Sequence, residues 1–135
     1  MSLFNPDQIP HLLDRDGWAI LSAERAHLSP ERNKARVDLL RTWLKQAHIP
    51  HLAAEGCYGG VKERSFVLLG VTEAEALALA RRFRQESILT RRGLVYADGR
   101  VEAPTGLPVV VSGRVRDGYT KLRKSGVKFT IPFEA

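Results

Sequence analysis

Two helix-start signals, set between short apolar runs, constrain the fold of this chain more than any other feature. Ser29-Pro30-Glu31 combines a hydroxyl cap, proline at the first helical position and an acid in the first turn. Thr72-Glu73-Ala74-Glu75 has the form of a capping box. The first helix is expected to end before Pro50, because the residue preceding a proline avoids helical angles, and the second to end near Arg84.

Short buried strands are predicted on both sides of these helices. They are expected at Trp18–Leu21, His51–Cys57, Arg64–Gly70, Ser87–Thr90 and Gly93–Tyr96, with further strands at Pro108–Val111 and Lys128–Ile131. The order strand, helix, strand, strand, helix, strand is that of a ferredoxin-like split β-α-β-β-α-β sandwich. We therefore expect an α+β fold of this type with an appended C-terminal β-ribbon.

The length of 135 residues suits one domain. We expect a lead-in over residues 1–16 with a short helix, an α+β core over 17–100 and a β extension over 101–135. No apolar run approaches the ~20 residues of a membrane helix, and no secretory signal is visible, so we expect a cytoplasmic protein without a membrane partner. Cys57 is the single cysteine, which excludes an internal disulfide framework and a cysteine-based zinc cage.

Positive charge is concentrated in the C-terminal half. The net charge is +6, and Arg81–Lys128 contains 12 Lys and Arg against four acids. Such a segment attracts nucleic acid, nucleotides or other anions. A surface that is merely solvated and rich in arginine explains the same charge, and the sequence leaves both readings open.

The turn within Gly56–Phe66 is the first candidate site. Adjacent Gly59 and Gly60 allow a ligand to approach backbone amides, and Lys62 and Arg64 could neutralise an anion. Tyr58 could stack or donate a hydrogen bond, and the polar pattern continues through Glu63 and Ser65. A hairpin that simply needs glycine is the alternative.

A second cluster, Gln85-Glu86-Ser87, follows the second helix and opens a strand that we expect at a sheet edge. If this strand points its side chains toward the Tyr58 turn, the two segments form one recessed polar surface. Glu63 or Glu86 would then be the candidate general base of an enzyme. A polar helix terminus is the alternative reading of this cluster.

The third cluster is a basic segment with one tyrosine, which suits contacts with a nucleic-acid backbone and stacking on a base. Its residues are Arg114, Arg116, Tyr119, Lys121, Arg123 and Lys124. A solvated hairpin turning at Asp117-Gly118 is the alternative. The four histidines show no ligand spacing, so no metal or cofactor is predicted.

Several short motifs resemble an uncharacterised family of bacterial and phage proteins, the domain of unknown function 3293. They are Ser29–Asn33 with Arg36, Tyr58-Gly59, Lys62–Phe66 and Phe83–Leu89. The resemblance implies no activity. It implies a shared site that is formed by the polar residues of these motifs, namely Asn33, Arg36, Tyr58, Glu63, Ser65, Gln85 and Ser87.

Three functions are compatible with these observations. The first is a non-catalytic binding module for an anionic ligand (a nucleotide, a phosphate-bearing group or nucleic acid), or a phage-type protein that binds a host protein. The second is a small enzyme acting on a phosphorylated or nucleotide substrate with a glutamate base. The third is a protein-interaction module that uses the C-terminal ribbon as an exposed edge. The oligomeric state is left open.

Overall fold

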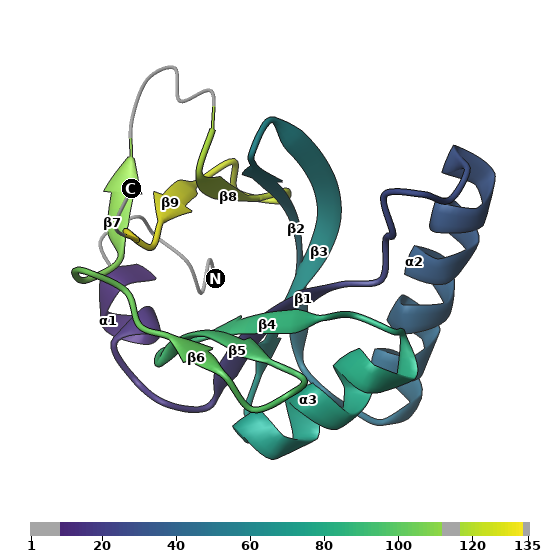
Figure 1. Cartoon of the computed structure of the whole chain (residues 1–135), viewed down its shortest axis with the longest axis horizontal. Coiled ribbons are helices and arrows are strands. Elements are labelled where there is room, and N and C mark those ends of the chain that lie inside the picture. The colour runs from purple at the N-terminus through teal and green to yellow at the C-terminus, as the bar shows by residue number, and fades with distance from the viewer. Residues whose placement is uncertain (1–8, 112–116, 134–135) are drawn as a thin grey trace.

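One antiparallel sheet of nine strands forms the body of the protein. The structure is a computed structural model, and it describes residues 9–111 and 117–133. The sheet curls into a half-barrel (Figure 1). Its strand order is β6-β5-β4-β1-β3-β2-β8-β9-β7. The elements are α1 Ile9–Leu13, β1 Trp18–Ser22, α2 Pro30–Gln46, β2 His51–Tyr58, β3 Val61–Leu69, α3 Glu73–Arg82, β4 Ser87–Thr90, β5 Gly93–Tyr96, β6 Val101–Glu102, β7 Val109–Val111, β8 Tyr119–Leu122 and β9 Lys128–Thr130.

Both helix-start predictions are confirmed. The Ser29 hydroxyl accepts a hydrogen bond from the Arg32 amide at 3.2 Å at the start of α2. At the start of α3, the Glu75 amide donates to the Thr72 hydroxyl and the Thr72 amide donates to the Glu75 carboxylate, each at 3.1 Å. These caps satisfy amides that have no partner within the helix, and they therefore place the first turn of each helix.

Replacing Thr72 by alanine is expected to lower the free energy of unfolding by about 1 kcal/mol, because the side chain that accepts from the Glu75 amide is lost. Urea unfolding followed by circular dichroism measures the change. Thr42→Ala is the matched control, since the exposed Thr42 hydroxyl donates to a carbonyl within α2 and caps no helix. Equal losses in the two variants would contradict a specific capping effect.

Alternation along β1 divides its side chains between two cores. Ala19 and Leu21 face the two long helices, whereas Trp18 and Ile20 face the concave side. The helix-side core includes Leu40, Leu44, Phe66, Leu68, Leu79, Ala80 and Ile88. The concave-side core includes Leu13, Ala54, Val67, Leu89, Leu122, Phe129 and Ile131. Helices α2 and α3 thus cover the convex face, and the opposite face of the same sheet is concave (Figure 1).

The predicted ferredoxin-like sandwich with an appended ribbon is wrong. In that fold β2 would be an edge strand, but β8 pairs with it from Ala54↔Leu122 to Cys57↔Tyr119. At the other side, β5 pairs with β4, so β4 is not the predicted edge either. The C-terminal strands extend the same sheet beyond β2, and the sheet curls over its own concave face.

The segment that forms β8 was predicted to be a basic contact for nucleic acid or a solvated hairpin, because of its lysines and arginines. Tyr119, Thr120 and Leu122 are nevertheless buried, while Lys121 between them is half-buried. Pairing with β2 and β9 is what turns these residues into a strand. Within residues 9–111 and 117–133, no helix is long and apolar enough to cross a membrane.

Candidate active site

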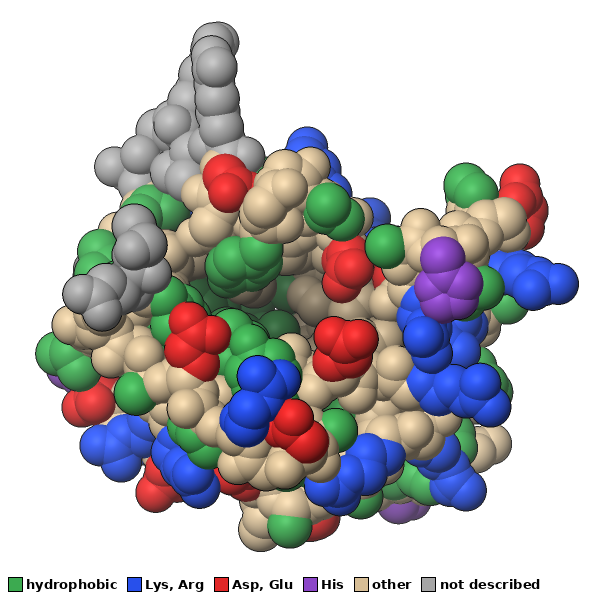
Figure 2. Space-filling view, viewed as in Figure 1, with side chains coloured by type: hydrophobic (Ala, Val, Ile, Leu, Met, Phe, Trp, Pro, Cys, Tyr) green, Lys and Arg blue, Asp and Glu red, His purple; other side chains and the backbone are tan. Residues whose placement is uncertain are grey.

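A pocket of about 340 Å³ opens in the concave face of the sheet. Figure 2 shows this hollow with hydrophobic side chains inside it and acidic side chains at its rim. Strands β1, β2, β3, β4, β5 and β8 contribute to its wall, as does the segment after β9. The lining residues are Ile20, Leu21, Ser22, Gly56, Tyr58, Val61, Glu63, Ser65, Gln85, Ser87, Ile88, Leu89, Leu94, Thr120 and Phe133.

Alternation along β3 decides which charges reach the pocket. Val61, Glu63 and Ser65 line it, whereas Lys62 and Arg64 occupy the intervening positions and do not. The Arg64 guanidinium pairs instead with the Glu24 carboxylate at 3.2 Å. Among the described residues, Glu63 is consequently the one charged side chain in the lining, which contains no lysine or arginine from this part of the chain.

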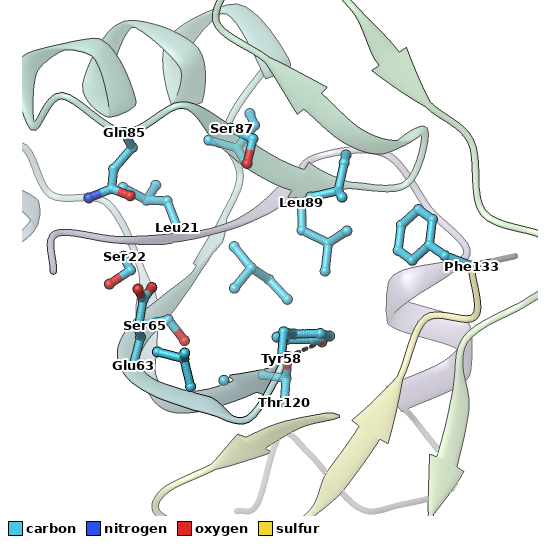
Figure 3. A pocket seen from close by; sticks show the side chains of 15 residues that line it. Leu21, Ser22, Tyr58, Glu63, Ser65, Gln85, Ser87, Leu89, Thr120 and Phe133 are labelled. Atoms are coloured by element: carbon cyan, nitrogen blue, oxygen red, sulfur yellow. Dashed lines mark hydrogen bonds between the residues drawn. The ribbon is translucent and has the colours of Figure 1, made fainter. Parts of the chain in front are cut away.

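The pocket has a polar end and an apolar end (Figure 3). Gln85, Ser22 and Glu63 gather at the polar end, and Leu89 and Phe133 lie at the other. The polar end is braced by backbone contacts: the Gln85 amide group donates to the Glu24 carbonyl at 2.9 Å. The Ser22 hydroxyl donates to the Arg64 carbonyl at 2.7 Å.

The Glu63 carboxyl group is half-buried, and its electrostatic surroundings disfavour ionisation. Burial raises the pKa of Glu63, and the negative charge of Glu24 raises it further. A positively charged ligand group would relieve this cost, because it favours the ionised carboxylate. The polar end is therefore suited to a cation.

Tyr58 lies between the two ends of the pocket (Figure 3). Its hydroxyl forms a hydrogen bond with the Thr120 hydroxyl at 3.0 Å. Burial is the main cause that raises the pKa of Tyr58 above its ordinary value, so the phenol stays protonated at neutral pH. A protonated hydroxyl at this place is able to donate a hydrogen bond to an anionic ligand group.

The Ser65 hydroxyl is a further polar group in the pocket wall. It is buried, and it has no hydrogen-bond partner among the described residues. A buried hydroxyl without a partner costs about 1–3 kcal/mol, so such groups are often completed by a ligand or water.

A family model described as the S-adenosylmethionine lyase family matches residues 19–126. The match includes every residue of the pocket lining except Phe133. The chain belongs to the S-adenosylmethionine lyase family. No match was found among curated proteins.

Membership of the lyase family corrects two predictions. The resemblance to domain of unknown function 3293 is overturned, because the match is to a family named for an activity. The interpretation as a non-catalytic binding module is overturned for the same reason. The alternative hypothesis of an enzyme is closer to the activity in the family name. However, the phosphorylated or nucleotide substrate of that hypothesis differs from S-adenosylmethionine.

Five of the residues predicted for the site lie together in the pocket of this lyase-family chain. They come from the two segments that we expected to converge, and they are Tyr58, Glu63, Ser65, Gln85 and Ser87. Glu86, the other candidate base, is exposed and does not line the pocket. The functional role of all these residues stays a prediction.

Other predicted residues support the fold around the lyase-family pocket rather than line it. The buried Asn33 side chain bonds both the amide and the carbonyl of Arg25, at 2.8 and 3.0 Å. The Arg36 guanidinium donates to the Ala23 carbonyl at 2.6 Å and to the Phe83 carbonyl. Gly59 and Gly60 form the β2–β3 turn, and their amides bind Asp117 instead of a ligand.

The predicted nucleic-acid cluster is only partly described. Arg114 and Arg116 lie outside the described residues. Tyr119 is buried, and the Lys128 ammonium group lies 4.9 Å from its ring centre, so this ring is not available for stacking on a base. Contacts of Lys121, Arg123 and Lys124 with nucleic acid stay a prediction.

Sequence analysis missed several lining residues, among them Ser22, Thr120 and Phe133. Alternation along β1 could have placed Ser22 on the face of Ile20, opposite the helices. No comparable signal pointed to Thr120 or Phe133, because their places depend on the pairing of β8 and β9. In the part of the chain that the structure describes, no group of three or more His, Cys, Asp or Glu side chains could hold a metal ion.

Proposed function

We propose that this chain cleaves S-adenosylmethionine in the concave pocket, with the compound consumed as substrate. The observation that carries the proposal is the charge of the lining: one carboxylate, Glu63, at the polar end of a pocket within the region matched to the lyase family. S-Adenosylmethionine has a sulfonium and an ammonium group, both positive. A pocket whose described lining has a single acid and no basic side chain is complementary to such a molecule.

The two ends of the pocket indicate how the substrate lies. Its planar adenine is the less polar part and suits Leu89 and Phe133, whereas its amino-acid part suits Glu63, Ser22 and Gln85. In this orientation the Tyr58 hydroxyl lies between the two parts. It is placed to donate to the substrate carboxylate, because the phenol stays protonated.

The chemistry of a lyase decides which positive group Glu63 pairs with. When a carbon–sulfur bond breaks without water, its electron pair goes to sulfur, and the sulfonium becomes a neutral thioether. The carbon then forms a bond to an oxygen of the substrate's own carboxylate, or a carbon–carbon double bond as a neighbouring carbon loses a proton to a base. A carboxylate beside sulfur would therefore stabilise the substrate more than the transition state. The ammonium group keeps its charge throughout, so we assign Glu63 to the ammonium group.

Turnover of S-adenosylmethionine by the purified protein tests this function. In water enriched in oxygen-18, mass spectrometry at early times is expected to show a thioether and a second fragment, neither of which contains the heavy isotope. Incorporation of the isotope in the first product would indicate hydrolysis instead. Absence of any turnover, with the protein folded, would contradict the proposal.

Phe133→Ala is expected to raise KM for S-adenosylmethionine about tenfold and to leave kcat nearly unchanged. In the proposed orientation this ring of the pocket wall packs against the adenine, away from the reacting sulfur. Steady-state kinetics measures both constants. Leu107→Ala is the control in the same C-terminal region, since Leu107 is 69% exposed and does not line the pocket. A fall in kcat with constant KM would contradict this placement of the adenine.

A cytoplasmic location stays a prediction from the sequence, as does any contact with a host protein or nucleic acid. The lyase proposal depends on neither.

A further inference from the structure

We infer that Asp117 and Thr120, which flank the start of β8, are positioning residues that hold Tyr58 in its working orientation. Neither residue was predicted for the site. The inference rests on the proposed function, because it assigns Tyr58 a part in binding the substrate. It also explains why the side chain of Tyr58, which lies next to the turn of a hairpin, can keep one orientation.

Packing alone does not hold the Tyr58 side chain. It is 42% exposed, and Tyr58↔Val61 is the last pair of the β2–β3 ladder before the turn. Strand ends and turns open more readily than central strands. A ring at such a place needs other contacts to stay in one orientation.

Asp117 binds the turn directly after Tyr58. Its carboxylate accepts hydrogen bonds from the Gly60 amide at 2.8 Å and the Gly59 amide at 3.2 Å. Gly59 and Gly60 have φ values of 63° and 76°, which this tight turn requires and other residues rarely adopt. The next amide, that of Gly118, donates to the Cys57 carbonyl at 2.7 Å. Hydrogen bonds with the two residues just before β8 thus hold the hairpin on both sides of Tyr58.

The negative charge of the Asp117 carboxylate suits it to accept hydrogen bonds from the Gly59 and Gly60 amides. The Gly60 and Gly59 amides hold the pKa of Asp117 below its usual value, so the carboxylate is ionised at neutral pH. The sequence predicted that a ligand would approach these amides, whereas in the structure they bind the Asp117 side chain. Because the folded-state pKa is lowered, protonation weakens the clamp only as pH falls through that lowered value.

Thr120 binds the tyrosine itself. Its side chain is 1% exposed, and its hydroxyl lies 3.0 Å from the Tyr58 hydroxyl. When Thr120 donates this hydrogen bond, the Tyr58 proton is left to point toward the substrate. Gly56, the cross-strand partner of Thr120, leaves room for the ring, because a Cβ at this position would lie 3.4 Å from the ring edge.

The test compares two substitutions at Thr120. Thr120→Val removes the hydroxyl and keeps the shape, and it is expected to lower kcat/KM about tenfold, the effect of one lost hydrogen bond. Thr120→Ser keeps the hydroxyl and is expected to restore most of the activity. Stability follows the opposite order, because serine leaves a methyl-sized void in a buried place. An activity order that follows stability would overturn the positioning function.

Asp117→Asn tests the clamp. An asparagine side chain can accept from only one of the two glycine amides, so faster hydrogen exchange at Gly59 and Gly60 and about a fivefold lower kcat/KM are expected. Asp98→Asn is the matched control, since Asp98 also accepts from a turn amide, that of Arg100, but outside the pocket. Unchanged kcat/KM and exchange rates in Asp117→Asn would overturn the clamp.

Tyr58→Phe and the double variant with Thr120→Val complete the cycle. If Thr120 acts through Tyr58, the double variant loses no more activity than Tyr58→Phe alone. Additive losses, or full activity of Tyr58→Phe, would overturn the inference. If the unaltered protein does not turn over S-adenosylmethionine, the proposed function fails by itself. The NMR signals of the Tyr58 ring in Thr120→Val and Asp117→Asn then decide whether these residues hold the ring: unchanged signals overturn the inference, and broadened or shifted signals support it.

Discussion

Glu63→Gln is expected to lower kcat/KM for S-adenosylmethionine by between about 30- and 100-fold, mainly through KM. Removing one partner of a desolvated charge pair typically costs 2–5 kcal/mol, and the lower end applies because Glu63 is only half-buried. Steady-state kinetics separates KM from kcat. Glu55→Gln on the neighbouring strand is the matched control, since Glu55 lies outside the pocket lining and opposite Arg64 in the ladder.

The same variant distinguishes two functions of the carboxylate. If Glu63 were a general base, as the alternative enzyme hypothesis holds, Glu63→Gln would lower kcat and leave KM nearly constant. Loss confined to kcat would therefore contradict pairing with the ammonium group. Unchanged kinetics would remove Glu63 from both functions.

The pH dependence of this variant follows from the raised pKa of Glu63. In the unaltered protein kcat/KM is expected to fall on the acid side as Glu63 becomes protonated, with an apparent pKa above that of an ordinary glutamate. This acid limb is expected to disappear in Glu63→Gln.

The stability of Glu63→Gln at neutral pH is expected to rise, whereas its activity is expected to fall. A carboxyl group whose pKa is raised by folding contributes stability below its unfolded-state pKa, and this contribution is lost as pH rises through the folded-state pKa. Glutamine resembles the protonated form, so Glu63→Gln is expected to have the higher Tm at neutral pH and no advantage below the unfolded-state pKa. Thermal unfolding at the two pH values measures this, and a lower Tm at neutral pH would contradict it.

Phe129→Ala is expected to lower the free energy of unfolding by about 3–5 kcal/mol, the range for removing a fully buried phenylalanine. Phe129 on β9 is 2% exposed and belongs to the concave-side core with Trp18 of β1 and Leu122 of β8. A loss of this size is a large part of the ~5–15 kcal/mol that stabilises a typical domain. Urea unfolding followed by circular dichroism measures it.

Val109→Ala on the neighbouring strand β7 is the control, because Val109 is 51% exposed and less than about 1 kcal/mol is expected. If the C-terminal strands were the independent ribbon that the sequence indicated, Phe129→Ala would leave unfolding of the rest of the sheet unchanged. A separate, early transition of the C-terminal strands would therefore contradict the single curled sheet.

How much of the candidate site could be predicted depended on where each residue lies along the chain. Tyr58, Glu63 and Ser65 were found because they are unusual polar residues at one turn, and Gln85 and Ser87 because they mark the end of a helix. The predicted anionic ligand, which stays untested, rested on counting Lys62 and Arg64 with Glu63. One-residue alternation along β3 places them away from the pocket, and only Glu63 enters it.

The helices, their caps and the turn between β2 and β3 were within reach of sequence reasoning, because a cap or a tight turn is formed by residues a few positions apart. Ser29, Thr72 and the glycines at 59 and 60 act on their own neighbours. The curl of the sheet, the pairing of β2 with β8 and the place of Phe133 came only with the tertiary structure. They depend on contacts between segments some 60 or more residues apart, as between Tyr58 and Thr120, and no local pattern encodes which distant strand will complete an open edge.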